Sequence, residues 1–158
     1  MKTLLIRLYK IAMPLLIFLC VLLVVLRLFG VSVIFVSGDS MEPTYKSGEL
    51  YLIAKADEYK RGDVVAVKLD NMTILKRIIA VEGDKVEIYY HCIFVNDEVV
   101  KSYIEDENWN NWSKLDTWQK IGPGEVFLLG DQRNLSADSR HFGTIKTEQI
   151  LGRVLNNE

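Results

Sequence analysis

Two residues far apart in the sequence have the types and surroundings that nucleophilic catalysis needs. Ser40 lies in a Gly- and Pro-containing stretch, residues 36–44, and Lys76 lies inside the apolar run of residues 74–80. A serine hydroxyl attacks well only when a neighbouring base takes its proton. A lysine can be that base if burial keeps it neutral, because loss of water penalises the ammonium form. The pair therefore indicates serine–lysine chemistry.

The setting of Lys76 supports this hypothesis. In a strand, Ile74, Lys76, Ile78 and Ala80 share one face, which carries no acidic residue. A free lysine has a pKa of about 10.4, so the site must lower it by several units. Two other interpretations stay open at this point: Lys76 as a surface lysine on an edge strand, and the Ser40 stretch as an inert polar loop.

Histidine is the more common base for a serine, but neither histidine here has a strong claim. His91 falls within a long predicted strand, residues 86–95, where a packed or edge histidine is the ordinary interpretation. His141 follows Arg140 in a polar loop and is interpreted as covering the sheet.

A third segment, residues 130–143, holds more Ser, Asp and Arg than a plain turn requires. Asp138 and Arg140 are two residues apart and can pair to brace the loop. Ser136 can form a hydrogen bond with a neutral amine and fix its direction.

An apolar segment precedes the Ser40 stretch. Residues 11–26 contain no charge, and the run extends to Phe29 if Arg27 reaches the membrane surface, which is about 28 Å of helix. No Ala-x-Ala-like end follows, so a retained anchor over residues 1–30 is favoured over a cleaved signal peptide. Three basic residues, Lys2, Arg7 and Lys10, precede the span and predict a cytoplasmic N-terminus. The rest of the chain is then expected outside the cytoplasmic membrane.

Residues 31–158 show many short apolar runs separated by turn residues. They predict a mostly β domain with one N-terminal transmembrane helix, folded as an antiparallel sandwich or half-open barrel. Residues 96–97 are expected in a turn, and residues 147–154 as a helical turn followed by a strand. The stretch 97–120 has no clear period and reads as an irregular insert.

Charge and cysteines narrow the class further. Residues 1–30 contain four of the 19 basic residues and no acid, which leaves 15 basic and all 21 acidic residues in the β domain. A domain this acidic is a poor candidate for binding nucleic acid. Cys20 lies in the span and Cys92 outside it, so no disulfide and no metal site is expected, and Cys92 is interpreted as a small apolar core residue.

The anchor and the three ordered motifs resemble bacterial type I signal peptidases over nearly the whole chain, in the compact form of that family. The resemblance implies a membrane-anchored serine endopeptidase that removes signal peptides from exported preproteins at the bilayer surface. It implies Ser40 as nucleophile, Lys76 as general base, Ser136 as the residue that orients the lysine, and the Asp138–Arg140 pair as the loop brace. No metal or cofactor is implied.

The resemblance also implies an oxyanion hole and small substrate pockets. The backbone N–H of Ser40 is one expected donor, whereas the side-chain donor that some relatives place two residues earlier is missing at Gly38. Pockets for small residues at positions −1 and −3 of the substrate are expected from four residues on the neighbouring strands: Val36, Met41, Ile74 and Leu75. An extended peptide would add to the sheet as a strand.

Three alternatives remain. A self-cleaving repressor with a similar dyad would need a DNA-binding domain where this chain has an anchor. A membrane-tethered assembly factor that keeps the fold would not need Ser40 and Lys76. A peptidase dedicated to one set of surface proteins would keep both.

Overall fold

The computed structural model describes residues 2–28, 30–70, 72–89, 92–100 and 118–155. The chain divides after Ser32 into two compact units. The first contains the helix α1 (Lys2–Leu28), which includes Pro14. Residues Arg7–Leu28 of this helix have a mean hydropathy of 2.8 and are long and apolar enough to cross a membrane.

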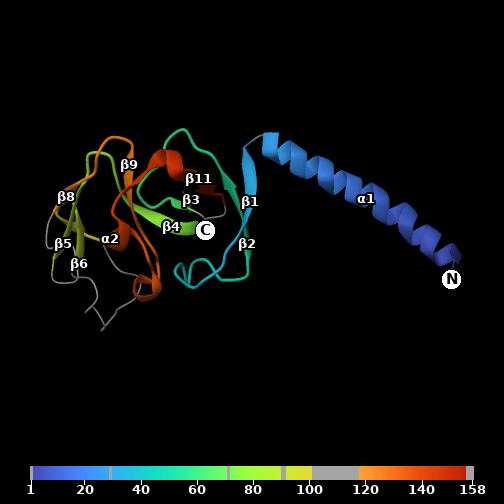
Figure 1. The fold of residues 1–158 in the computed structure, drawn as a ribbon, viewed down its shortest axis with the longest axis horizontal. Helices are drawn as coiled ribbons and strands as arrows, with labels where there is room; N and C mark the ends of the chain where they lie inside the picture. The colour runs from blue at the N-terminus through green and yellow to red at the C-terminus, as the bar shows by residue number, and fades with distance from the viewer. Residues whose placement is uncertain (1, 29, 71, 90–91, 101–117, 156–158) are drawn as a thin grey trace. The chain divides into compact units, whose positions relative to one another are not determined.

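The second unit is built from two antiparallel sheets, which lie side by side in Figure 1. The larger sheet contains, in spatial order, β1 (Val31–Phe35), β2 (Leu50–Ala54), β11 (Ile150–Val154), β3 (Val64–Leu69), β4 (Met72–Val81), β9 (Glu125–Leu129) and β10 (Ile145–Lys146). The smaller sheet contains β7 (Glu98–Val99), β6 (Cys92–Val95), β5 (Lys85–Tyr89) and β8 (Gln119–Lys120). The larger sheet is open, since it ends at β1 and β10.

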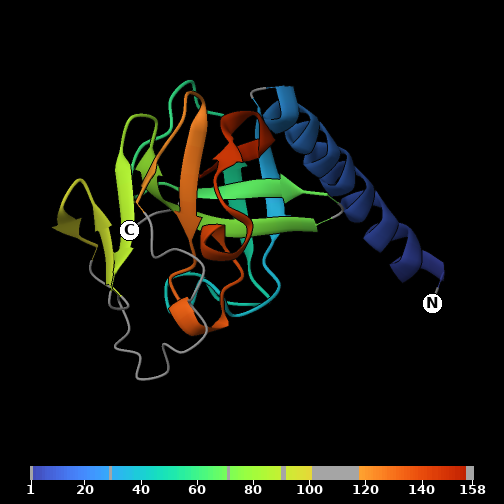
Figure 2. The same ribbon diagram turned by 60° about the vertical axis from the view of Figure 1, so that its left-hand side comes forward.

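Three short helical turns complete the described part of this unit. They are η1 (Arg133–Leu135), α2 (Ser139–Phe142) and η2 (Thr147–Gln149). Both ribbon views place α2 beside β9, whereas η1 lies beyond the end of that strand (Figure 2). The backbone N–H of Leu128 in β9 donates to Oγ of Ser139, which fixes α2 against the sheet.

The core follows the alternation of the strands. One face of the larger sheet and the turn after β1 form the Met41 cluster: Val36, Met41, Tyr45, Ile53, Val64, Ala66, Leu75 and Val154. The opposite face forms the Val65 cluster: Val65, Val67, Ile78, Val126, Leu128, Ile145 and Ile150. A third cluster joins the two sheets through residues such as Phe127 and Ile88.

The predicted fold class, a mostly antiparallel β domain after an apolar helix, is confirmed. The turn at Asn96 and Asp97 is confirmed too: both residues have positive φ, of 52° and 68°, and they join the paired residues Val95 and Glu98. Positive φ at both central residues is what a tight hairpin turn of this twist requires. The helical turn and strand expected over residues 147–154 are η2 and β11.

Two expectations for the smaller sheet are wrong. The long strand predicted over residues 86–95 is a hairpin, in which Val86 pairs with Val95 and Tyr89 with Cys92. Cys92 is exposed at the start of β6, so it is not a core residue. The ends of the expected insert form β7 and β8, and its residues 101–117 lie outside the described part of the chain.

Candidate active site

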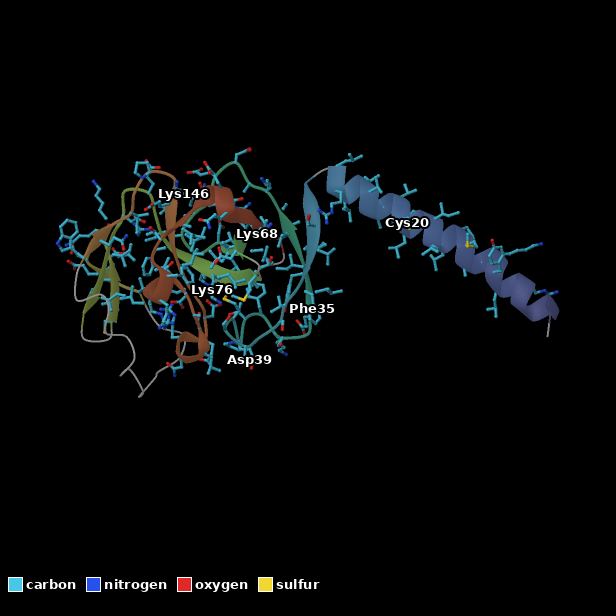
Figure 3. All side chains as sticks on the ribbon, in the orientation of Figure 1. Cys20, Phe35, Asp39, Lys68, Lys76 and Lys146 are labelled. Carbon is cyan, nitrogen blue, oxygen red and sulfur yellow. The ribbon has the colours of Figure 1, made fainter. Side chains whose placement is uncertain are left out.

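Ser40 and Lys76 meet in the second unit. Nζ of Lys76 lies 2.6 Å from Oγ of Ser40 and donates to the carbonyl oxygen of Leu75 at 3.0 Å. Ser40 comes from the turn after β1 and is half-buried, whereas Lys76 lies in the middle of β4 and is only 3% exposed. Figure 3 shows Lys76 among the side chains of the β domain. The structure thus brings the two predicted residues into hydrogen-bond contact.

Burial decides the charge state of this lysine. It lowers the pKa of Lys76 from 10.5 to about 8, because the ammonium form loses water. Asp138 raises the pKa and Arg140 lowers it, and Asp131 raises it as well. Loss of water outweighs the two carboxylates, so the amine is neutral in half of the molecules near pH 8. A neutral amine can accept the proton of Ser40.

The loop after β9 packs directly against the backbone of Ser40. The N–H of Gln132 donates to the carbonyl oxygen of Ser40 at 3.0 Å. A Cβ on Gly130 would lie 2.5 Å from the same carbonyl oxygen and would also overlap the side chain of Ser136. Gly130 is therefore needed for the close approach of three segments, and not for an unusual backbone angle.

Ser136 lies at this approach but forms no hydrogen bond with the amine here. Its Oγ is buried and has no hydrogen-bond partner among the described residues. A buried hydroxyl without a partner is costly, so it is a strong candidate for a bond to water or to a bound peptide. The expected role of Ser136 in orienting the lysine stays a prediction.

Asp138 and Arg140 form a buried ion pair that spans the loop. Nε of Arg140 donates to Asp138 at 2.6 Å and Nη2 donates at 2.8 Å, in a fork geometry. Asp138 also accepts from the N–H of Gly130 at 3.0 Å and caps α2. Nη2 of Arg140 donates to the carbonyl oxygen of Arg133. The pair thus ties the second half of the loop to its beginning, at Gly130 and Arg133.

A second ion pair at the site was not foreseen. Arg77, the neighbour of Lys76, donates from Nε and Nη2 to the two oxygens of Asp131, at 2.8 and 2.7 Å. Asp131 is 1% exposed. From the sequence, Arg77 is interpreted as an ordinary structural cation on the strand face opposite Lys76, with no partner predicted for it. A buried strand that carries an arginine needs an acidic partner nearby, and the 130–143 loop contains acidic residues. This much of the ion pair could have been predicted from the sequence.

A groove opens beside the dyad, with a volume of about 420 Å³ that includes its open side. It is lined by Ile34, Phe35, Val36, Ser37, Gly38, Ser40, Met41, Thr73, Ile74, Leu75 and Lys76. All four residues predicted to bind substrate lie here, together with the dyad. The groove is bounded by β1 and by the first half of β4, which are separated by three strands within the sheet. The sheet must therefore curl to bring them together.

The first half of β4 has an unpaired edge along this groove. β9 pairs with β4 only at Arg77–Val81, whereas β3 pairs with it from Met72 onward. The N–H of Ile78 bonds toward the β3 side, to Asp63. Backbone groups alternate in direction along a strand, so those of Thr73 and Leu75 point away from β3. The bond from Lys76 to the carbonyl oxygen of Leu75 agrees with this direction.

No metal-binding arrangement is found in the described ranges, where no group of three or more His, Cys, Asp or Glu side chains is placed to hold an ion.

Comparison with known proteins identifies the family. A sequence model described as "Signal peptidase, peptidase S26" matches residues 8–156. Signal peptidase I of Bacillus caldolyticus is 32% identical over 145 residues, which cover 82% of this chain and 80% of that protein. Signal peptidase IB of Staphylococcus aureus is 33% identical over 159 residues, covering 85% and 81%.

A solved structure supports the fold. The signal peptidase I from Enterococcus faecalis V583 superimposes with a TM-score of 0.51 and 22% identity, covering 65% of this chain and all of that one. The class is thus that of serine endopeptidases. The chain belongs to the signal peptidase family, peptidase S26. The family predicted from the sequence motifs is confirmed.

Proposed function

We propose that this protein removes N-terminal signal peptides from exported preproteins, with Ser40 as nucleophile and neutral Lys76 as general base. The contact of 2.6 Å between Oγ and a nearly fully buried Nζ carries the proposal. Signal peptidase I relatives over four-fifths of the chain support the substrate class. Helix α1 anchors the protein in the cytoplasmic membrane, with its N-terminus inside and the β domain outside, in accord with its N-terminal basic residues.

The substrate enters as an extended strand. Its backbone pairs with the free edge of β4 at Thr73 and Leu75, between β4 and β1, and so fills the gap in the curled sheet. Val36, Met41 and Leu75 contact the side chains at positions −1 and −3, and Ile74 lines the same groove. We expect these buried apolar residues to accept small side chains, as in the family, which favours alanine.

The reaction has two halves. Neutral Lys76 takes the proton of Ser40 while Oγ attacks the carbonyl carbon of the residue at position −1, and the N–H of Ser40 stabilises the oxyanion. The C–N bond then breaks, and the lysine passes its proton to the leaving amine. A water molecule gives a proton to the same amine and attacks the acyl-enzyme. The ester bond to Oγ of Ser40 then breaks, the lysine returns this proton to Oγ, and the signal peptide leaves with a free carboxylate. Ser136 orients the amine, and the Asp138–Arg140 pair holds the loop.

The test is direct. The purified full-length protein in detergent micelles is incubated with a preprotein, and the new N-terminus is read by mass spectrometry. Ser40→Ala and Lys76→Ala should each abolish cleavage, whereas Lys68→Ala, an exposed lysine on β3, should not. Turnover near wild type in either dyad variant excludes this mechanism.

The same assay separates the remaining alternatives. A non-catalytic assembly factor would leave every preprotein intact. A dedicated peptidase would cleave only one set of surface proteins from a panel of preproteins.

A further inference from the structure

An aromatic side chain stands exposed at the rim of the groove. Phe35, the last residue of β1, is 64% exposed although it lines the groove beside Ser40. Figure 3 shows it on the outside of β1. A large exposed apolar side chain at the edge of a binding site is a candidate contact for a ligand. The proposed roles of the groove residues do not use it.

The alternation of β1 places Phe35 on a definite face. Ile34 and Val36, its neighbours, pack into the Met41 cluster with Leu75. Successive side chains in a strand point to opposite faces, so Phe35 and Val33 lie on the other face. Their exposure, 64% and 46%, agrees with this assignment.

The alternation of β4 gives the same two faces on the opposite side of the groove. Leu75 belongs to the Met41 cluster, whereas Ile74 packs against the Val65 cluster on the opposite face of the sheet. Ile74 pairs with Val67 of that cluster across β3 and β4. Phe35 and Ile74 therefore border the groove on one face, and Val36 and Leu75 border it on the other.

A peptide strand in this groove alternates in the same way. If the small residues at positions −1 and −3 point toward Met41 and Leu75, the residues at −2 and −4 point to the face of Phe35 and Ile74. We infer that Phe35, supported by Ile74, determines specificity by contacting the side chains at positions −2 and −4 and favouring apolar ones. This inference rests on the proposed function. It adds contacts for positions −2 and −4 to a substrate site that so far binds positions −1 and −3.

Two peptides test it, both with alanine at −1 and −3, one with leucine and one with serine at −2. The ratio of kcat/KM for the two peptides is measured with the full-length protein in micelles, so that the fraction of active enzyme cancels. Cross-strand contacts of this kind are worth up to about fivefold in binding. Phe35→Ser should lower the leucine-to-serine ratio about threefold to fivefold, and Phe35→Leu should restore most of it.

Val33→Ser is the matched control, because Val33 is exposed on the same face of the same strand but does not line the groove. It should leave the ratio unchanged. An unchanged ratio in Phe35→Ser overturns the inference. The kinetics of Phe35→Ser are also measured in lipid vesicles. If kcat/KM falls equally for both peptides, and only in vesicles, the inference is overturned and Phe35 contacts the bilayer instead. If the wild-type protein cleaves neither peptide nor a preprotein, the proposed function itself fails.

Discussion

Replacing Lys76 by methionine should reveal the energetic cost of the buried amine. Methionine has a similar length and no charge, so the substitution removes the titration and keeps most of the packing. In the folded protein the pKa of Lys76 is about 8, against 10.5 in water. Between these two values the unfolded chain holds more protons than the folded one, so raising the pH stabilises the wild-type fold. The methionine variant lacks this contribution at every pH.

The magnitude follows from the two pKa values. From pH 7 to pH 10, the free energy of unfolding of the wild type should rise by about 2.5 kcal/mol relative to Lys76→Met. The methionine variant also lacks the hydrogen bonds of Lys76. Their loss lowers its stability at both pH values, so this cost cancels when the two pH values are compared. Urea unfolding of both proteins in micelles, followed by the circular dichroism of the β domain, measures the difference.

Lys68→Met is the control, since Lys68 is exposed on the strand next to β4 and should show no such pH dependence beyond about 0.5 kcal/mol. A wild-type-to-Lys76→Met difference that stays constant from pH 7 to pH 10 would refute the argument. It would mean that the amine has an ordinary pKa and is charged when the serine is supposed to lose its proton.

Three further results are expected. Because we propose that Lys76 acts in its neutral form, kcat/KM for a peptide should fall about tenfold between pH 7 and pH 6, and a rate that is flat down to about pH 5 would contradict a base with a pKa of about 8. Gly130→Ala should lower kcat/KM strongly, because the new Cβ displaces the carbonyl of Ser40; kinetics equal to wild type would show that the loop gives way freely. Asp138→Asn leaves Arg140 buried without its carboxylate and should cost about 3–5 kcal/mol of stability in chemical unfolding, whereas a loss under 1 kcal/mol would show the pair to be dispensable.

The site could be predicted from local patterns because its main parts are local. The turn around Ser40 and the aliphatic neighbours of Lys76 are visible within a few residues of each. Period-two alternation correctly placed Lys76 on a buried face of β4. The turn at Asn96 and Asp97 could also be predicted from local sequence, because these residue types favour positive φ.

Features that depend on the curl of the sheet could not be predicted in this way. The groove lies between β1 and β4, which are not neighbours in the sheet, and its geometry depends on three intervening strands. The partner of Arg77 is 54 residues away, at Asp131. The 130–143 loop contains two acids, Asp131 and Asp138, and the sequence alone has no means of choosing between them.

The hairpin of β5 and β6 was missed for a different reason. Residues 86–95 form an almost continuous apolar and aromatic run, and neither residue 90 nor residue 91 is a glycine, proline or asparagine. Without a turn signal, a run of β-forming residues is interpreted as one strand. The wrong prediction that Cys92 is a core residue has the same cause. Its side chain lies at the beginning of a separate short strand and is exposed.

The incomplete edge of β4 places the proposed base and the proposed substrate-binding site side by side. Because β9 begins to pair only at Arg77, Leu75 keeps a carbonyl oxygen that can accept from the amine of Lys76. The same edge offers Thr73 and Leu75 to a peptide strand. In the binding mode proposed above, a peptide at this edge would cover the open side of the groove and remove water from the amine. Loss of water favours the neutral amine, so substrate binding would lower the pKa of Lys76 further than burial in the free protein does.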